Sequence, residues 1–157
     1  MHHDPSTNGE IRPARHRATS GFTLLELMIA LVVISVLAAI AIPAYGDYLL
    51  RGRLAGGTAL LKSTRQQLEQ RYSDNRSYAD AGGACAIAPF LDTDSTFGFA
   101  CTVSAAGQQF VLTATGTGPT TGFTYSIDEA GVERTLAVRS GWTGASLPVN
   151  RFIVRKE

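Results

Sequence analysis

The sequence predicts an α+β fold in which one long N-terminal helix packs on a C-terminal antiparallel β-sheet. Two observations carry this prediction: an apolar run that passes into an amphipathic stripe, and four later segments rich in β-branched and aromatic residues. A sheet with a helix laid across its apolar face is a stable two-layer arrangement. The chain has 157 residues, about the length of one domain.

Residues 22–42 form an apolar run of 21 residues that contains a single charge, Glu26. A helix rises about 1.5 Å per residue, so this run reaches roughly 30 Å, the thickness of a bilayer's hydrocarbon core. Arg12, Arg15 and Arg17 precede the run, and basic residues tend to stay on the cytoplasmic side. We therefore expect one membrane span, with a cytoplasmic N-terminus and an exported remainder.

The helix is expected to continue beyond the span, although Pro43 should interrupt and bend it. Residues expected to face the globular head then recur every three or four positions, which is the helical period. These residues are Leu54, Thr58, Leu61, Arg65, Leu68 and Tyr72. Gly52 and Gly56 have the spacing that lets a second helix approach closely. We favour the alternative interpretation, in which these glycines are only weak points of the helix near its bend. The whole helix would cover residues 22–72.

The head is expected to begin with a loop over residues 73–84, followed by an antiparallel meander. The predicted strands are residues 97–104, 109–115, 123–128 and 134–140. Phe110, Leu112 and Ala114 alternate on one strand face, and we expect this face to contact the helix stripe at Leu61 and Leu68. Trp142 is expected to cap this core; stacking on a ligand is the less favoured alternative.

The chain has two cysteines, Cys85 and Cys101, and both lie in the predicted exported part. Because that side of the membrane is oxidising, we expect them to form a disulfide. Closing a loop of about 17 residues should stabilise the fold by roughly 3 kcal/mol in the chain-entropy model.

The junction before the span differs from that of a secretory signal, whose cleavage site follows the apolar run. Here the small residues of "ATSG" precede the run, so a cut after Gly21 would leave the span attached. The stretch "SGFTLLELMIALVVISVLAAIAIPAYGDYLLRGR" resembles the prepilin signature of type IV pilins and type II secretion pseudopilins. The resemblance is strong over residues 20–53, and the remainder is similar to minor pilins, with the type IV pilin fold.

The resemblance implies that prepilin peptidase cuts between Gly21 and Phe22 and that the same enzyme methylates the new N-terminus of Phe22. It also assigns Thr23, Glu26 and Pro43 to filament assembly. A carboxylate near the bilayer costs a few kcal/mol, and the Phe22 ammonium lies one helical turn away. Pairing of Glu26 with the Phe22 amine of a neighbouring subunit would satisfy both charges. The alternative is that Glu26 snorkels into the headgroups.

These inferences divide the chain into four parts. Residues 1–21 are a cleaved leader, 22–43 a transmembrane and filament-core helix, 44–73 its amphipathic continuation, and 74–157 a globular head. The resemblance implies an inner-membrane protein that passes into an extracellular fibre. Its implied partners are other pilin subunits, the prepilin peptidase/N-methyltransferase and the inner-membrane assembly platform. One departure from many such pilins is that no cysteine follows Cys101 to tie down the C-terminal region.

The sequence favours no enzyme, cofactor or metal site. His2, His3 and His16 all lie in the leader, so histidine-dependent nucleophilic catalysis is excluded after cleavage. Asp92 and Asp94 stand two residues apart without a third ligand nearby, which favours a solvated turn over a calcium site. The run "GTGPTTG" lacks the GK[ST] ending of a phosphate loop and is expected to be a turn.

The favoured function is therefore a structural subunit, a minor pilin of a type IV pilus. Such fibres serve adhesion, twitching motility and DNA uptake. The alternatives are a type II secretion pseudopilin and a DNA-binding minor pilin for natural transformation. DNA binding would need a basic surface, and the candidate residues are Arg134, Arg139, Arg151, Arg155 and Lys156. Three of the 14 basic and two of the 13 acidic residues precede Phe22, leaving 11 of each, so DNA is not the favoured partner.

Overall fold

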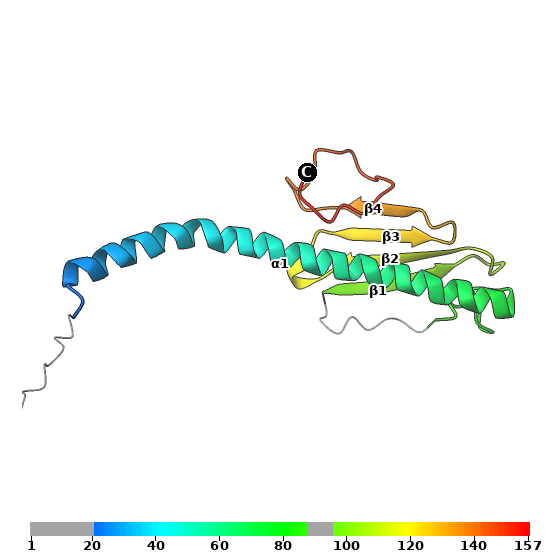
Figure 1. Cartoon of the computed structure of the whole chain (residues 1–157). Helices are drawn as coiled ribbons and strands as arrows, with labels where there is room; N and C mark the ends of the chain where they lie inside the picture. Colours follow the sequence, from blue (N-terminus) through cyan, green and yellow to red (C-terminus); the bar gives the residue numbers. More distant parts are fainter. Residues whose placement is uncertain (1–20, 88–95) are drawn as a thin grey trace, which may run out of the picture. The chain divides into compact units, whose positions relative to one another are not determined.

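The computed structural model describes residues 21–87 and 96–157 of the chain. Their order is one long helix followed by four strands (Figure 1). The helix α1 spans Leu24–Asn75, and it continues through Pro43 instead of being interrupted there. A proline within a helix removes one backbone hydrogen-bond donor, but the residues on both sides of Pro43 remain helical. The chain divides into two compact units, Met1–Ile40 and Ala41–Glu157.

The first part of α1 exposes its apolar side chains. All large apolar residues in 22–42 are exposed, for example Leu31 at 55% and Ile40 at 71%. This part of the helix is long and apolar enough to cross a membrane, as the sequence predicted, and none of its most apolar window is buried. Exposed apolar surface on this scale needs lipid or other helices to cover it.

The second part of α1 buries one narrow stripe, which confirms the predicted amphipathic pattern. Leu54, Leu61 and Leu68 are at most 1% exposed, and Thr58 is 6% exposed. Leu50 and Thr64 extend the buried stripe beyond the predicted set. Side chains three and four positions apart share one face of a helix, so this face meets the sheet while its flanks remain polar.

The sheet is an antiparallel meander of order β1-β2-β3-β4, again as predicted. Its strands are β1 Phe97–Val103, β2 Phe110–Gly116, β3 Thr124–Asp128 and β4 Glu133–Ala137. A short 3-10 helix, η1 Gly118–Thr120, joins β2 to β3. Each strand end lies within three residues of its predicted position. The strands run side by side behind α1 (Figure 1).

The core lies between this sheet and the buried stripe of α1. Phe110, Leu112 and Ala114 alternate inward on β2 and are at most 1% exposed, in one cluster with Leu61 and Leu68. This confirms the predicted contact face. Register extends the face across the sheet, since Leu112 pairs with Cys101 on β1 and with Ile127 on β3.

Two glycines of α1 differ in what surrounds them. A Cβ on Gly57 would lie 2.5 Å from Cε2 of Phe97, so this glycine lets the helix approach the sheet. A Cβ on Gly52 would meet nothing within 4 Å. The helix therefore needs Gly57 for packing, and it stays helical through both residues.

Aromatic side chains join the end of α1 to the loop that follows. The ring of Tyr78 stacks on Tyr72 at 4.5 Å between centroids and meets Phe110 edge-on at 4.7 Å. The Tyr78 hydroxyl donates to Glu69 Oε2 at 3.2 Å. Burial and the nearby Glu69 carboxylate raise the pKa of Tyr78 to about 12. The loop is thus held to the last turns of the helix.

The C-terminal segment is held without a cysteine, mainly by Thr135 on β4. The Thr135 hydroxyl donates to Arg151 O at 2.6 Å and accepts from the Ile153 N–H at 2.9 Å. Thr135 also exchanges backbone hydrogen bonds with Val149. The hydroxyl of Tyr125 donates to Ile153 O at 2.7 Å, and burial raises the pKa of that hydroxyl. These bonds attach the C-terminal segment to β3 and β4.

Trp142 caps one end of the core, as predicted. It is 5% exposed, and its ring meets Phe123 edge-on at 4.9 Å between centroids. Its backbone carbonyl accepts a hydrogen bond from Glu157 N–H at 2.9 Å. The buried ring therefore serves packing and does not present a stacking surface.

Candidate functional site

The residues at the predicted cleavage junction precede α1 and are exposed. Gly21 has open space around it, since a Cβ there would meet nothing within 4 Å, and Phe22 is 84% exposed. Proteases cut preferentially at exposed backbone, and both residues are exposed. The predicted leader, residues 1–20, lies outside the described residues.

Thr23 and Glu26 form the start of α1. Thr23 precedes the first helical residue, and its Oγ1 accepts a hydrogen bond from the Glu26 backbone N–H at 3.2 Å. This is the N-cap contact, and Thr-x-x-Glu is the capping-box spacing. The Glu26 carboxylate is exposed and makes no ion pair among the residues that the structure describes. Thr23 therefore orders the helix start, and Glu26 remains available for a partner.

Cys85 and Cys101 form a disulfide, as predicted from the redox environment. Their Cα atoms are 5.9 Å apart and their sequence separation is 16 residues. Cys101 lies on β1, and Cys85 lies in the loop after α1, where it pairs with Ala79 in an isolated β-bridge. The bond attaches that loop to the edge strand of the sheet.

Two of the five candidate basic residues are neutralised by carboxylates. Arg134 Nη1 lies 2.7 Å from Asp128 Oδ2, and Arg151 Nη2 lies 2.6 Å from Glu157 Oε2. Burial would raise the pKa of Asp128, but hydrogen bonds from the Val132 N–H and from Arg134 outweigh burial and lower it. Salt bridges of this kind remove free positive charge from a surface.

The other three candidates differ in how firmly they are held. Arg139 Nη2 donates to Pro119 O at 2.9 Å, and its guanidinium lies 5.6 Å from the centre of the Phe123 ring. Arg155 and Lys156 are exposed and form no ion pair within the described ranges. The five residues thus do not act as one free cationic patch.

The predictions about metal ions can be compared with only part of the chain. In residues 21–87 and 96–157, no group of three or more His, Cys, Asp or Glu side chains is arranged to hold a metal ion. Asp92 and Asp94, and the three histidines, lie outside the described residues, so the expectation of a solvated turn stays a prediction.

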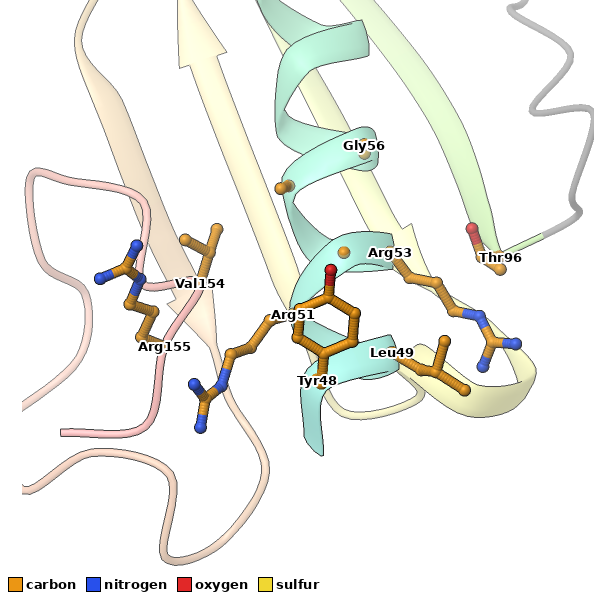
Figure 2. Close-up of a pocket in the computed structure, with 11 residues that line it drawn as sticks. Tyr48, Leu49, Arg51, Arg53, Gly56, Thr96, Val154 and Arg155 are labelled. Atoms are coloured by element: carbon orange, nitrogen blue, oxygen red, sulfur yellow. The ribbon is translucent and has the colours of Figure 1, made fainter. Parts of the chain in front are cut away.

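The structure also brings together a basic groove that sequence reasoning missed. Its volume is about 770 Å³, and its lining includes Arg51 and Arg53 of α1 and Arg155 near the C-terminus. Figure 2 shows Arg51 and Arg155 on one side of the helix and Arg53 near Thr96 on the other. The available signal was the pair of arginines soon after the apolar run, but the third arginine is about 100 residues away in sequence.

Two family profiles match the chain over adjacent ranges. Residues 16–42 match the prokaryotic N-terminal methylation motif. Residues 43–124, just over half of the chain, match the family described as type IV minor pilin ComP, DNA uptake sequence receptor. The helix with its methylation motif and the four-stranded head together define a pilin-like protein. The chain belongs to the type IV minor pilin family of ComP.

Curated relatives agree with this assignment. The fimbrial protein EcpC of Eikenella corrodens is 38% identical over 95 residues, which are 60% of this chain and 61% of the relative. A fimbrial protein of Moraxella nonliquefaciens is 40% identical over 63 residues, 40% of this chain and 41% of the relative. The chain thus spans less than two thirds of the length of these relatives.

One solved structure matches part of the chain. It is a type IV pilin from Shewanella oneidensis, 27% identical, with a TM-score of 0.42. The match covers 54% of this chain and 89% of the other.

Proposed function

We propose that the chain is a structural subunit, a minor pilin, of a type IV pilus. The observation that carries the proposal is the exposed apolar half of α1, in which Leu31 and Ile40 are more than half exposed. In water such a surface would aggregate. A bilayer covers it before assembly, and helices of other pilins cover it in the fibre. The membrane is the inner membrane, and the head faces away from the cytoplasm.

Processing is the first step of this function. Prepilin peptidase cuts the bond between Gly21 and Phe22 and the same enzyme methylates the Phe22 amine. Support comes from the methylation motif at residues 16–42 and from the exposure of both junction residues. Because the cut precedes the apolar run, the product keeps its anchor.

Assembly then uses the new amine. The ammonium of Phe22 in one subunit pairs with Glu26 of a neighbour, so two charges that would be costly in an apolar core neutralise each other. Thr23 supports this contact by capping the helix through the Glu26 N–H. Pro43 lies further along the same helix. In the fibre, this part of the helix would pack against the helices of neighbouring subunits.

Mass spectrometry of sheared surface fibres and of membranes tests both steps. We expect a peptide that begins with methylated Phe22, at low abundance beside another pilin. The substitution Gly21→Ser should leave the leader attached, whereas Gly144→Ser, at an open position in the head, should not. Leader still attached to the wild-type chain would overturn the processing step.

Glu26→Gln separates assembly from processing. The variant should be cut and methylated but should be lost from fibres, because an amide cannot neutralise the Phe22 ammonium. Asp47→Asn, which removes an acidic charge further along α1, is the matched control and should assemble. Normal incorporation of Glu26→Gln would show that the pair does not guide assembly.

A type II secretion pseudopilin remains the structural alternative. The same fractions distinguish the two functions: a processed chain that is absent from surface fibres and retained in the membrane would favour the pseudopilin.

A second candidate function is DNA binding by the head, which the description of the matching family favours. The free cations Arg155 and Lys156, with Arg139 nearby in sequence, would contact phosphates, whereas Arg134 and Arg151 are already paired. Binding of duplex DNA by the full chain should weaken steeply with salt, because bound cations are released from the phosphates. Arg139→Gln with Lys156→Gln should reduce the salt slope by about two. No binding at low salt would exclude this function.

A further inference from the structure

The groove beside α1 is lined in part by glycines, which have no side chains to fill it. Gly52 and Gly56 line it, and a Cβ on either would meet nothing within 4 Å. Tyr48, Leu49 and Val154 add an aromatic ring and two apolar side chains to the lining. Figure 2 shows the Tyr48 ring at the centre of the groove, between the arginines of its two sides. A ligand can therefore approach the bare helix backbone and meet both polar and apolar groups.

The groove is strongly cationic. Among the residues that the structure describes, Arg51, Arg53 and Arg155 line it, and no acidic residue does. In the described part of the chain none of these three guanidinium groups has an ion pair or a hydrogen bond to protein. Even Asp47, one helical turn before Arg51, forms no ion pair with it. Three unpaired guanidinium groups around one hollow select for a phosphate-bearing ligand, because each can bind phosphate oxygens bidentately.

The position of the groove along α1 identifies the source of that phosphate. The apolar run ends at Ile42, and Tyr48 follows six residues later, which is about 9 Å along a helix. Tyr45 and Tyr48 are 63% and 70% exposed. Exposed tyrosines just beyond an apolar span are typical of the membrane–water interface. When the span lies in the bilayer, Tyr48 at the start of the groove is therefore close to the lipid headgroups, and Arg51 and Arg53 follow within two helical turns.

We propose that this groove binds the headgroup of an anionic phospholipid in the exported-side leaflet. Arg51, Arg53 and Arg155 hold the phosphate groups, while Leu49 and Val154 contact the glycerol and the start of the acyl chains. The inference rests on the membrane-anchored stage of the proposed function. It adds that the head is oriented on the membrane by a lipid, and that this contact must break when the subunit enters a fibre.

The test uses the full mature chain in nanodiscs of phosphatidylcholine with increasing fractions of phosphatidylglycerol. Native mass spectrometry then measures the fraction of protein molecules that retain phosphatidylglycerol. Each basic residue near an anionic surface contributes about fivefold in affinity. We therefore expect Arg51→Gln, Arg53→Gln and Arg155→Gln each to raise the phosphatidylglycerol fraction needed for half-occupancy by about fivefold.

Arg76→Gln is the matched control, because Arg76 is exposed, lies near the far end of α1 and forms no ion pair within the described ranges. It removes the same charge about 38 Å further along the helix axis and should leave retention unchanged. All four side chains are exposed, and an unchanged Trp142 emission spectrum would verify folding of each variant.

Three results would overturn the inference. Equal retention of phosphatidylglycerol and phosphatidylcholine would show that the groove has no anionic preference. Equal losses for Arg76→Gln and the groove variants would show only diffuse charge attraction. Displacement of the lipid by inorganic phosphate or by duplex DNA, at unchanged affinity for nanodiscs, would assign the groove to a soluble ligand. Failure of the chain to insert into any nanodisc would instead contradict the proposed membrane stage.

Discussion

The two halves of α1 are built from similar apolar residues but use them in opposite ways. In residues 22–42 every large apolar side chain is exposed, whereas further along the helix Leu54, Leu61 and Leu68 are almost completely buried. The first half has apolar residues all around its circumference, and the second half restricts them to one stripe. A helix that is apolar all round needs other molecules to cover it, and a helix with one stripe is covered by its own chain.

The largest expected difference between the halves comes from shortening a leucine. Leu54→Ala should lower the free energy of unfolding of the head by about 2–5 kcal/mol, because the side chain is fully buried and leaves a cavity. Leu31→Ala, in the exposed half, should change it by less than about 0.5 kcal/mol. Urea unfolding of the full chain in detergent, followed by Trp142 fluorescence, measures both. Similar effects of the two substitutions would break the comparison.

The disulfide should matter for the head alone. Replacing both Cys85 and Cys101 by Ser should lower the free energy of unfolding by about 3 kcal/mol, because the unfolded chain gains loop freedom. The helicity of the apolar half of α1 should not change, since no cysteine lies in it. The same urea titration, with circular dichroism in detergent, gives both values. A loss of helicity in the apolar half would mean that the two halves fold together.

Alanine substitutions at two glycines of α1 should change the stability of the protein in opposite directions. Gly57→Ala should destabilise the head by about 1–3 kcal/mol, because the new Cβ would press on Phe97. Gly52→Ala should stabilise the helix by up to about 1 kcal/mol, because its Cβ meets open space and alanine favours helix. Thermal unfolding of the two variants side by side measures the difference. The same sign for both would show that the helix does not rest on the sheet at Gly57.

The smallest expected effect is electrostatic and depends on pH. Hydrogen bonds lower the pKa of Asp128 in the folded state, so its carboxylate stabilises the fold above the unfolded pKa of about 3.9. This stabilisation is lost as the pH falls through the lower pKa of the folded state. Asp128→Asn should therefore cost about 1 kcal/mol or less near neutral pH, and nothing in strong acid. Unfolding titrations at several pH values measure the difference; a constant difference would exclude a charge effect.

Much of the fold could be predicted because its signals are local. The span, the stripe from Leu54 to Tyr72 and the four strands follow from periodicities that neighbouring residues create. The Cys85–Cys101 bond followed from the compartment and from the presence of two cysteines. The N-terminal methylation motif was recognisable for the same reason, since it is contiguous; cleavage between Gly21 and Phe22 stays a prediction.

The candidate basic surface was predicted less well. Arg134, Arg139, Arg151, Arg155 and Lys156 are close in sequence, and from spacing alone they form one group. In the structure Asp128 and Glu157 neutralise two of them, while a third donates to the carbonyl of Pro119. A carboxylate that pairs with an arginine through tertiary contacts has no fixed sequence spacing from it. Which of the arginines are neutralised could therefore not be predicted from the sequence.

The sequence by itself determined the apolar half of α1, the amphipathic half and the order of the strands, because each depends on residues adjacent along the chain. Only the tertiary structure decided that Thr135 holds the C-terminal segment, that Gly57 permits contact with Phe97, and that Arg155 joins Arg51 and Arg53 in one groove. The contacts of Thr135 with the C-terminal segment, of Gly57 with Phe97 and of Arg155 with the helix arginines all join residues at least 14 positions apart in sequence. Such contacts form only when the sheet and the helix bring distant segments together, and local periodicity does not predict them.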